Sequence, residues 1–311
     1  MSSILSGIFT LSFLIVVIRL TTPIFFAGLS SYAAGITGIG NIGVESIMTM
    51  AALFGVLGSY WTQNVVLGIL IGLAVGVLMA TMIAFFSMKL GADPVLVGIA
   101  LNTFADSLAI FILYLFTGDK GSSASLPIKT LGTIDIPVIK DIPILGDILS
   151  GQAITTYLCW IVIIVFYILV FKTPLGIRMR ACGLNPEAAK TAGVNVQRLQ
   201  VLSLVFSGIF AAFGGMYLSL NYLFIYSKKM VSGMGWMGIA ANGIASGNYW
   251  LLLGTCLIFG AFRAISIVFA TTSSFPSDLL TAVPYIAVFA ILVGSSIYQT
   301  FKLKRGDTKE N

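Results

Sequence analysis

Long apolar runs follow one another along almost the whole chain, separated by short polar stretches. A helix of about 20 apolar residues crosses a bilayer, so each long run predicts a transmembrane helix. Backbone N–H and C=O groups cannot stay unpaired in hydrocarbon, which excludes open sheets from these runs. The predicted spans are 4–18, 21–37, 44–60, 64–87, 93–117, 151–171, 199–222, 233–247, 250–271 and 278–298.

Two stretches, 23–40 and 233–247, are interrupted by glycine or proline. Irregular backbone at membrane depth needs protein or a water-filled cavity around it, so we expect half-helices or re-entrant segments there. Gly68, Gly72 and Gly76 are spaced four apart, which predicts close helix packing. The fold class expected is all-α: one polytopic membrane domain over residues 1–300, with about 8–10 transmembrane helices.

Composition supports a membrane protein. Hydrophobic residues make up 58% of the chain, charged residues only 9%, and the mean hydropathy is +1.03. Soluble proteins average about 25% charged residues. The net charge of +6 is concentrated in particular loops. It therefore indicates orientation in a membrane and no nucleic-acid partner.

Lysine and arginine in short loops predict the orientation. Segment 172–198 has five basic residues against one acidic residue, and the tail 301–311 is also basic, so both are predicted to be cytoplasmic. Segment 118–150 has three lysines against four aspartates and is predicted to lie outside, as a lid or a passive connection. Ten crossings would place both termini in the cytoplasm of a bacterial cell, with Lys228 and Lys229 outside as a departure from the rule.

Several kinds of chemistry require residues that the sequence lacks. The chain has no histidine and no Gly-x-x-x-x-Gly-Lys-Ser/Thr, which excludes histidine chemistry and a phosphate cradle of its own. Its three cysteines show no metal-ligand spacing, so neither a metal nor another cofactor is expected in this chain. The run 4–18 lacks a basic n-region and a cleavage site, and we expect it to remain as an anchor.

Segment 172–198 contains two short predicted helices with clear end signals. Pro174 fits the first position of one helix. For the second, Asn185 is an N-cap, Pro186 fits N1, Glu187 suits the positive end of the helix dipole and Gly193 suits C′. A charged helix pair between membrane spans indicates a segment through which another protein transmits movement to this one. A basic connecting loop at the lipid surface is the simpler alternative.

This segment resembles the coupling segment of ABC-importer permeases, the membrane subunits that dock on an ATP-hydrolysing partner. The family pattern of Glu-Ala-Ala, three residues and Gly is present as Glu187-Ala188-Ala189-Lys190-Thr191-Ala192-Gly193. The hydrophobic-Pro ending of the maltose-type branch is absent. Residues 174–186 instead look like the branch for simple sugars, branched-chain amino acids and nucleosides.

A second resemblance narrows the branch. Asn41-Ile42-Gly43-Val44-Glu45 resembles the motif of nucleoside and simple-sugar permeases that work with basic-membrane-protein-type lipoprotein receptors. Ser46 stands where these permeases commonly have glycine. The stretch Gly235-Trp236-Met237-Gly238-Ile239-Ala240 extends the likeness toward the C-terminal half.

The resemblance implies a type II ABC-importer-like fold and a transport subunit that is not an enzyme. The partners it implies are a cytoplasmic ABC ATPase that binds ATP and magnesium, a second and paralogous permease, an extracytoplasmic substrate-binding lipoprotein, and a small neutral polar solute. The ATPase-coupling residues it implies are Pro174, Gly176, Arg178, Arg180, Gly183, Asn185, Pro186, Glu187, Ala188, Ala189 and Gly193.

Two kinds of contact are expected from the coupling segment. Arg178, Arg180 and Lys190 would pair with acidic groups of the ATPase, or else anchor to anionic lipid headgroups. Ala181, Ala188 and Ala189 would form a small-residue face suited to close docking.

Polar residues within the apolar runs indicate where a substrate could pass, because a charge at the bilayer centre costs at least about 2.5 kcal/mol. Glu45 either accepts hydrogen bonds from substrate or caps a half-helix. The amides either bind a polar solute or join helices, and the aromatic rings either stack on a base or sugar or simply pack. The candidate path residues are Asn41, Glu45, Asn102, Phe104, Asn221, Tyr222, Trp236 and Asn242.

Asp106, Arg263 and Asp278 also lie in or beside apolar runs, and Arg263 is expected to pair with Asp278. Proton- and sodium-coupled carriers usually have acidic residues in their spans. So few fixed charges therefore favour an importer whose energy is supplied by another protein. A secondary transporter remains the first alternative, and a lipid-modifying membrane enzyme is a weaker one. Within the importers, nucleosides are favoured as cargo, ribose-like sugars compete, and branched-chain amino acids follow.

Overall fold

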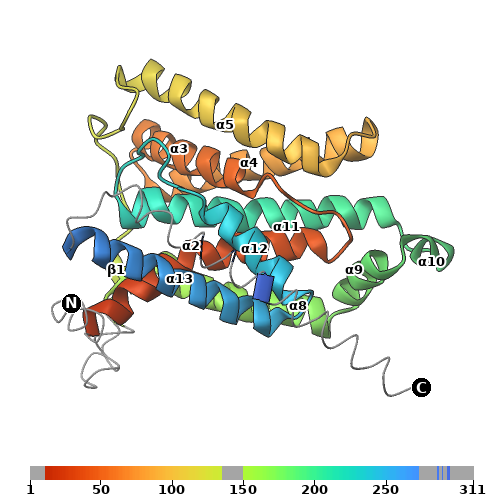
Figure 1. Ribbon diagram of the computed structural model, residues 1–311. Coiled ribbons are helices and arrows are strands. Elements are labelled where there is room, and N and C mark those ends of the chain that lie inside the picture. Colours follow the sequence, from red (N-terminus) through yellow and green to blue (C-terminus); the bar gives the residue numbers. More distant parts are fainter. Residues whose placement is uncertain (1–10, 135–149, 273–285, 287–288, 290–292, 295–311) are drawn as a thin grey trace.

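The computed structural model describes residues 11–134 and 150–272, together with four positions between 286 and 294, and shows a bundle of long helices (Figure 1). The described α-helices are α2 Leu11–Gly35, α3 Val44–Thr62, α4 Val65–Ala84, α5 Pro94–Thr117, α8 Ile154–Lys172, α9 Pro174–Leu184, α10 Pro186–Thr191, α11 Val196–Tyr217, α12 Met234–Ala245 and α13 Tyr249–Thr272. Two π-helical turns, Phe85–Lys89 and Leu218–Tyr222, continue α4 and α11. Strands β1 Thr133–Ile134 and β2 Gln152–Ala153 pair antiparallel, with Thr133 opposite Ala153. In the described part of the chain, seven helices are long and apolar enough to cross a membrane, which confirms the predicted polytopic all-α fold.

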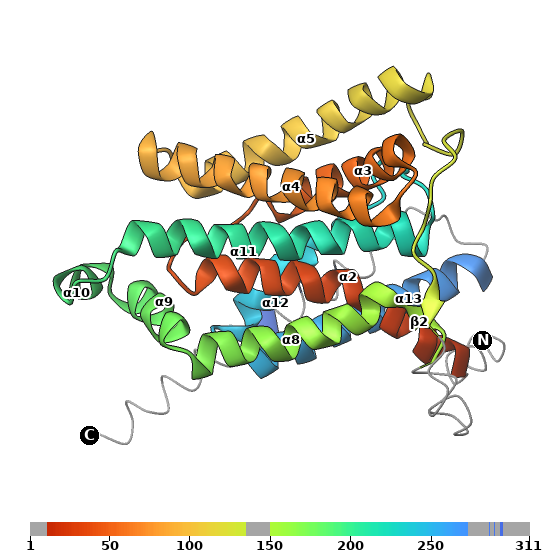
Figure 2. The ribbon, with the colours of Figure 1, turned by 180° about the vertical axis from the view of Figure 1, so that it is seen from behind.

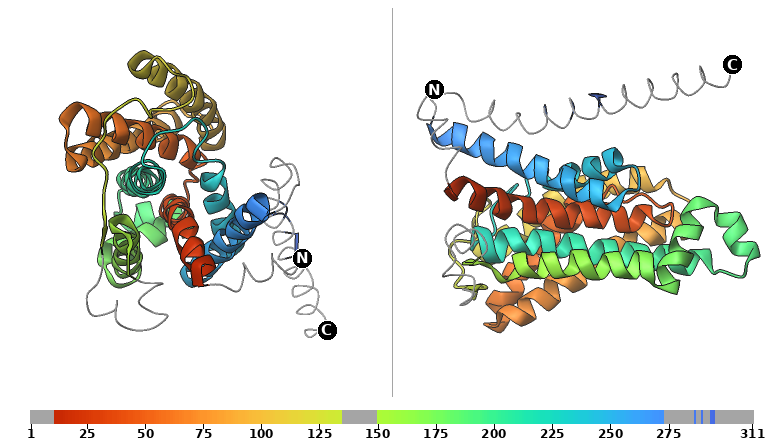
Figure 3. Two further views of the ribbon diagram at one scale, coloured as in Figure 1. Left: turned by 90° about the vertical axis from the view of Figure 1, so that its left-hand side faces the viewer. Right: turned by 90° about the horizontal axis from the view of Figure 1, so that it is seen from below.

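Helices α2 and α11 lie at the centre of the bundle, as the end view in Figure 3 shows. Helix α11 packs on α2, α3 and α4, and α2 also packs on α12 and α13. Two hydroxyl pairs join the central helices: Ser30 Oγ lies 2.8 Å from Ser207 Oγ, and Thr37 Oγ1 lies 2.6 Å from Ser203 Oγ. Hydroxyls that bond to each other can be buried between apolar helices without an unsatisfied polar group.

The glycines of α4 allow close approach, as their spacing predicts. A Cβ at Gly68 would lie 2.7 Å from the carbonyl oxygen of Gly55, and one at Gly76 would lie 2.5 Å from Cβ of Ala212. A Cβ at Gly72 would collide with Met216 Sδ. This small-residue face therefore lets α3 and α11 pack directly against the backbone of α4.

We expect Gly68→Leu to destabilise the protein by about 1–3 kcal/mol, because overpacking forces two helices apart. The matched control is Gly254→Leu on α13, where a Cβ would meet nothing within 4 Å. Thermal unfolding of both variants in detergent measures the difference. An equal midpoint for the two variants would contradict the packing described for α4.

The N-terminal spans differ from the prediction. The predicted spans 21–37 and 4–18, as far as the latter is described, form one continuous helix, α2, which passes through Pro23 and ends at Gly35. Residues 1–10 lie outside the described part of the chain. The expected half-helix over 23–40 is therefore wrong up to Gly35, and only 36–43 is irregular.

Helix α2 has a definite direction along the bundle. Its end lies at the inner end, defined here by α9 and α10, because Gly38 contacts Gly183. Its beginning lies toward the outer end, defined by β1 and β2, where Arg19 Nε donates to Gln152 Oε1 at 3.3 Å. Because the two predicted spans form one helix, the predicted number of membrane crossings falls by one. The number of crossings therefore no longer places the N-terminus in the cytoplasm.

Helix α12 is short, as the glycine-rich stretch 233–247 predicts. It has 12 residues and is about 18 Å long at 1.5 Å per residue, too little to cross a bilayer. It begins inside the bundle and runs toward the inner end (Figure 1). The predicted span 278–298 and the tail 301–311 lie almost entirely outside the described residues.

The described part of the predicted outer segment, 118–134, is held down by hydrogen bonds. Lys228 N donates to Gly121 O at 2.8 Å, and Tyr226 N donates to Ser123 Oγ at 2.8 Å. Ser59 Oγ at the end of α3 donates to Lys129 O at 2.6 Å. This segment is therefore a strap across the ends of α3 and the 223–233 loop. Burial raises the pKa of the Tyr226 phenol, which stays neutral there.

Candidate functional site

Helices α9 and α10 form an elbow that protrudes from the inner end of the bundle (Figures 1 and 2). Pro174 stands at the start of α9, and Thr173 Oγ1 accepts a hydrogen bond from Gly176 N at 3.2 Å. Asn185 caps α10 by accepting from Ala188 N at 3.0 Å. The helix-end signals predicted for Pro174 and Asn185 are confirmed.

Helix α10 ends in the left-handed turn predicted at Gly193. That glycine has φ +81° and donates to Lys190 O at 3.0 Å, while Val194 N donates to Ala189 O at 3.0 Å. This pair of bonds is a Schellman motif, which needs a residue at positive φ. The elbow is thus a defined structure and not a flexible basic loop.

Two predicted coupling glycines fix the elbow to the bundle. A Cβ at Gly176 would collide with the carbonyl oxygen of Val170 at the end of α8, and a Cβ at Gly183 would collide with that of Ile36 after α2. Any side chain at these positions would therefore push α9 away from the bundle. Contact of either glycine with an ATPase stays a prediction.

The predicted docking face of Ala181, Ala188 and Ala189 is not a single surface. Ala188 is exposed, Ala189 is buried, and Ala181 lines a pocket. Among the large hydrophobic side chains of the described residues, Leu184 is the most exposed, at 88%. Sequence reasoning missed it, although an isolated leucine next to an N-cap asparagine in a charged loop is a usable signal.

The charged residues of the elbow point in different directions. Arg178, Glu187 and Lys190 are exposed. Arg180 instead turns toward the bundle, with its guanidinium carbon 5.0 Å from the centre of the Phe171 ring. Arg180 is therefore less available to a partner than Arg178 is.

A second polar region lies where α12 begins. Glu45 Oε1 accepts from Gly233 N at 2.7 Å, and Oε2 accepts from Gly235 N at 2.8 Å. The carboxylate thus satisfies two N–H groups of the positive helix end, where negative charge is favourable. Of the two interpretations of Glu45, this geometry supports the helix cap.

Asn102 and Asn41 hold the irregular segment 36–43. Asn102 accepts from Ser46 N at 2.9 Å and donates to Ile42 O at 3.1 Å. Asn41 accepts from Gly43 N and donates to Ser207 Oγ, both at 2.8 Å. Both side-chain amides form hydrogen bonds within the protein. This geometry supports the alternative that they join helices.

The remaining candidate path residues do not gather in one place. Asn221 accepts from Thr155 Oγ1 at 2.9 Å toward the outer end, and neighbouring Tyr222 stacks on Tyr217. Asn242 donates to Ser31 Oγ at 3.1 Å toward the inner end. Glu45, Asn102 and Trp236 lie near one another at the start of α12, and Asn41 lies on the adjacent segment 36–43. Their contact with a substrate stays a prediction.

The exposed residues of α5 separate into two faces. Asp106 lies one turn after Asn102, so both share a face of α5, whereas Phe104 points to the other side. Asp106 is exposed, lies in the middle of α5, and is close enough to Lys229 for the charges to interact. The sequence showed Asp106 as an acid in an apolar run, but only the structure places it beside the start of α12.

The predicted Arg263–Asp278 pair and the expected absence of a metal both stay predictions. Arg263 Nη1 donates to Ser232 O at 3.3 Å, while Asp278, its predicted partner, lies outside the described residues. Within the described ranges, no group of three or more cysteine, aspartate or glutamate side chains is placed to hold a metal ion.

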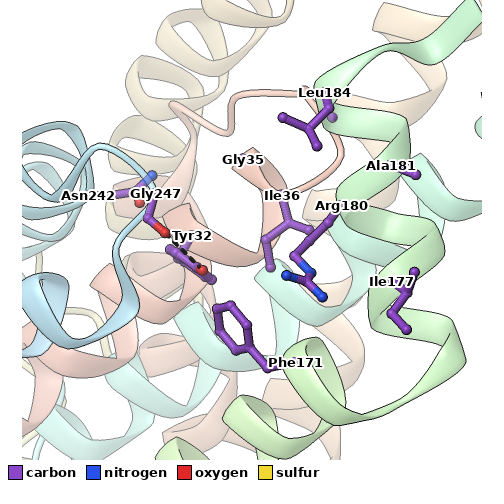
Figure 4. Close-up of a pocket in the computed structure, with 11 residues that line it drawn as sticks. Tyr32, Gly35, Ile36, Phe171, Ile177, Arg180, Ala181, Leu184, Asn242 and Gly247 are labelled. Carbon is purple, nitrogen blue, oxygen red and sulfur yellow. Dashed lines mark hydrogen bonds between the residues drawn. The ribbon is translucent and has the colours of Figure 1, made fainter. Parts of the chain in front are cut away.

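A pocket of about 670 Å³ opens at the inner end, between α2, α9 and α12 (Figure 4). Its walls are mainly apolar, with Arg180 and Asn242 among the few polar groups. It was not expected from the sequence, because its residues come from three distant stretches of the chain, 32–36, 171–184 and 242–247.

Residues 13–292 match the family model described as the permease component of branched-chain amino acid transport systems. The chain is 28% identical to the nucleoside ABC transporter permease protein NupC of Lactococcus lactis, covering 89% of this chain and 90% of the relative. It is also 28% identical to the guanosine ABC transporter permease protein NupQ of Bacillus subtilis, covering 88% of each. TsgC13 of Haloferax volcanii, named for glucose transport, is 27% identical over 80% of this chain and 75% of its own length.

The fold is also similar to a solved structure. PsaBC from Streptococcus pneumoniae, in complex with Fab, matches with a TM-score of 0.53 at 13% identity, covering 93% of this chain and 94% of that one. At this identity the likeness supports the fold and nothing finer.

Proposed function

Because this chain belongs to the family of permease components of branched-chain amino acid transport systems, we propose that it forms the nucleoside path of an ATP-driven importer. The observation that carries the proposal is the match to NupC and NupQ over nearly nine-tenths of the chain. ATP hydrolysis belongs to a separate subunit, since the sequence contains no Walker-type phosphate loop.

The elbow of α9 and α10 is the proposed contact with that ATPase. It protrudes from the bundle, its ends are fixed by caps, and Gly176 and Gly183 hold it tightly to α8 and α2. A rigid projection can transmit displacement to the helices behind it, whereas a flexible loop would absorb it. This assignment makes the inner end cytoplasmic, in agreement with the basic charge of 172–198.

The proposed substrate path follows the face shared by α5 and α12. A carboxylate in the middle of a membrane helix is costly in lipid, so exposed Asp106 fits a water-filled passage or a subunit interface. Trp236, which is 42% exposed, lies in the first turn of α12, next to the N–H groups that Glu45 caps. An acceptor carboxylate and an aromatic face suit the ribose hydroxyls and the base of a nucleoside.

The partners follow from this arrangement. A second permease, paralogous rather than identical, would cover the face with Asp106 and Trp236 and complete the passage. An extracytoplasmic lipoprotein would deliver the cargo to the outer end, near the strap at 118–134.

ATP-dependent uptake by the whole importer in proteoliposomes tests the function. We expect accumulation of radiolabelled guanosine and uridine that requires ATP and receptor, and that unlabelled nucleosides inhibit. Inhibition by ribose or glucose alone would instead assign a sugar, in line with the glucose-named relative TsgC13. Uphill accumulation by this chain alone would overturn the importer assignment.

Replacing Asp106 with leucine tests the path. We expect kcat/KM for nucleoside uptake to fall by about tenfold or more, because a hydrogen bond to a charged group contributes about 1.5–3 kcal/mol. Thermal stability should not fall, since leucine is favourable on a membrane helix. Phe104→Leu, on the other side of α5, should leave uptake unchanged. Normal uptake by the Asp106 variant would place the path elsewhere.

A further inference from the structure

The pocket at the inner end has one charged group in an otherwise uncharged wall. Among the described residues, its lining contains no aspartate or glutamate, and Arg180 is the single cation. Figure 4 shows the guanidinium between Phe171 and Ile36, pointing into the space beneath α9. The rest of the wall is aliphatic, aromatic or glycine, apart from Tyr32 and Asn242.

Arg180 is half-buried, and one of its donors has no partner among the described residues. Its Nε–H is buried, and none of the described residues offers it an acceptor within hydrogen-bonding distance. The ring of Phe171, 5.0 Å from the guanidinium carbon, contacts the group but offers no hydrogen-bond acceptor to Nε. A buried charged donor without an acceptor is unfavourable, so a missing anion is the simplest explanation.

The other polar groups of the pocket are engaged on one side only. Tyr32 donates its hydroxyl hydrogen to Gly247 O at 3.3 Å, which leaves the phenol oxygen free to accept. Asn242 uses its Nδ2 toward Ser31 Oγ. The guanidinium is thus the strongest free donor in the cavity.

We propose that this pocket binds a phosphate group at Arg180, carried by an anionic phospholipid of the adjacent leaflet or by a phosphorylated solute. A planar guanidinium matches phosphate oxygens with two parallel hydrogen bonds. The volume of about 670 Å³ accommodates a headgroup with the first part of its chains.

The position and the wall of the pocket favour the lipid as the source. Arg180 is eight residues after Lys172, the last residue of the apolar span α8, so it lies close to the membrane surface. Ile177, at the rim, is 56% exposed and offers an apolar surface for acyl chains. Basic pockets between transmembrane helices on the cytoplasmic side are suited to anionic headgroups.

A phosphate in this pocket would join the elbow to the bundle. Arg180 belongs to α9, Tyr32 to α2 and Asn242 to α12, so a ligand between them connects the ATPase-contacting helix with the half-helix at the proposed path. This inference goes beyond the proposed function and requires only that the inner end is cytoplasmic, not that the cargo is a nucleoside.

The test uses the whole importer in nanodiscs that contain equal amounts of phosphatidylcholine and phosphatidylglycerol, with native mass spectrometry of the retained lipids. We expect wild type to retain phosphatidylglycerol preferentially, and Arg180→Gln to retain about fivefold less, the contribution of one interfacial arginine. Arg178→Gln is the matched control, because it removes the same charge from the exposed side of the same helix.

A second pocket variant and a second set of ligands complete the test. Ala181→Glu places a carboxylate in the pocket beside an intact Arg180, so it should also lower retention even if Arg180→Gln assembles poorly. In nanodiscs of phosphatidylcholine alone, inorganic phosphate and a nucleoside monophosphate are added, and thermal unfolding is followed.

The outcomes separate the two sources. Loss of phosphatidylglycerol in both pocket variants, but not in Arg178→Gln, supports a lipid headgroup. Protection of wild type but not of the pocket variants by soluble phosphate compounds, without a lipid preference, supports a phosphorylated solute. Equal behaviour of Arg180→Gln and wild type in both arms, or an equal loss in Arg178→Gln, would overturn the phosphate site.

Discussion

Replacing Leu184 with aspartate is expected to abolish ATP-driven uptake while leaving membrane insertion intact. Leu184 is 88% exposed at the turn between α9 and α10, so its substitution does not disturb the packing of the bundle. An apolar side chain so exposed on a protruding elbow fits an anchor in a partner's groove. Loss of such an anchor costs about 2 kcal/mol or more, or about 30-fold in affinity for the ATPase.

Co-purification of the ATPase, together with uptake, measures this effect. The conservative variant Leu184→Met keeps an apolar side chain and should retain both. Substitutions at Ala189 or Gly183 are poor tests of docking, since Ala189 is buried and Gly183 abuts the backbone of Ile36. A Leu184→Asp protein that retains normal uptake would refute the contact proposed for the elbow.

Replacing Glu45 with alanine is expected to cost about 3 kcal/mol or more of stability, since it leaves two buried N–H groups without acceptors. These groups belong to Gly233 and Gly235 at the start of α12. Without the carboxylate the first N–H groups of α12 lose their acceptors, so the first turn of α12 should unwind. Uptake should fall with it, because Trp236 lies in that turn.

Thermal unfolding followed by tryptophan fluorescence measures the loss. Asp93→Ala is the matched control: Asp93 caps α5 in the same manner, accepting from Val95 N at 2.7 Å, but it is exposed to solvent. An exposed cap contributes about 1 kcal/mol. If Glu45→Ala were no more destabilising than Asp93→Ala, the cap at α12 would be unimportant and the substrate-contact alternative for Glu45 would regain support.

Much of the elbow and of α12 could be predicted from the sequence, because local residues determine both. Asn185, Pro186 and Gly193 act on the backbone within a few residues, so their roles follow from sequence alone. The glycines of 233–247 likewise indicate a short helix inside the bundle. The carboxylate that caps this helix comes from Glu45, 188 residues before Gly233, and the sequence alone did not indicate which helix start Glu45 caps.

The course of α2 could not be predicted, because Pro23 normally ends or kinks a helix. Here Thr21 Oγ1 donates to Val17 O at 2.6 Å, and Thr22 Oγ1 donates to Ile18 O at 2.9 Å. These hydroxyls add a second donor to carbonyls in the turn before Pro23, while packing by α11, α12 and α13 holds the helix continuous through the proline. The positions of Ala189, Arg180 and Asp106 depend in the same way on tertiary packing, which periodicity does not specify.

The strap at the outer end has a mechanical consequence for delivery of cargo. Ser122 forms a β-bridge with Ser227, and only five residues separate Ser227 from Gly233, where α12 begins. A receptor that binds to this strap would therefore displace the start of α12, which Glu45 caps. If the proposed receptor binds there, its arrival would reach the start of α12, inside the bundle, before any solute is released.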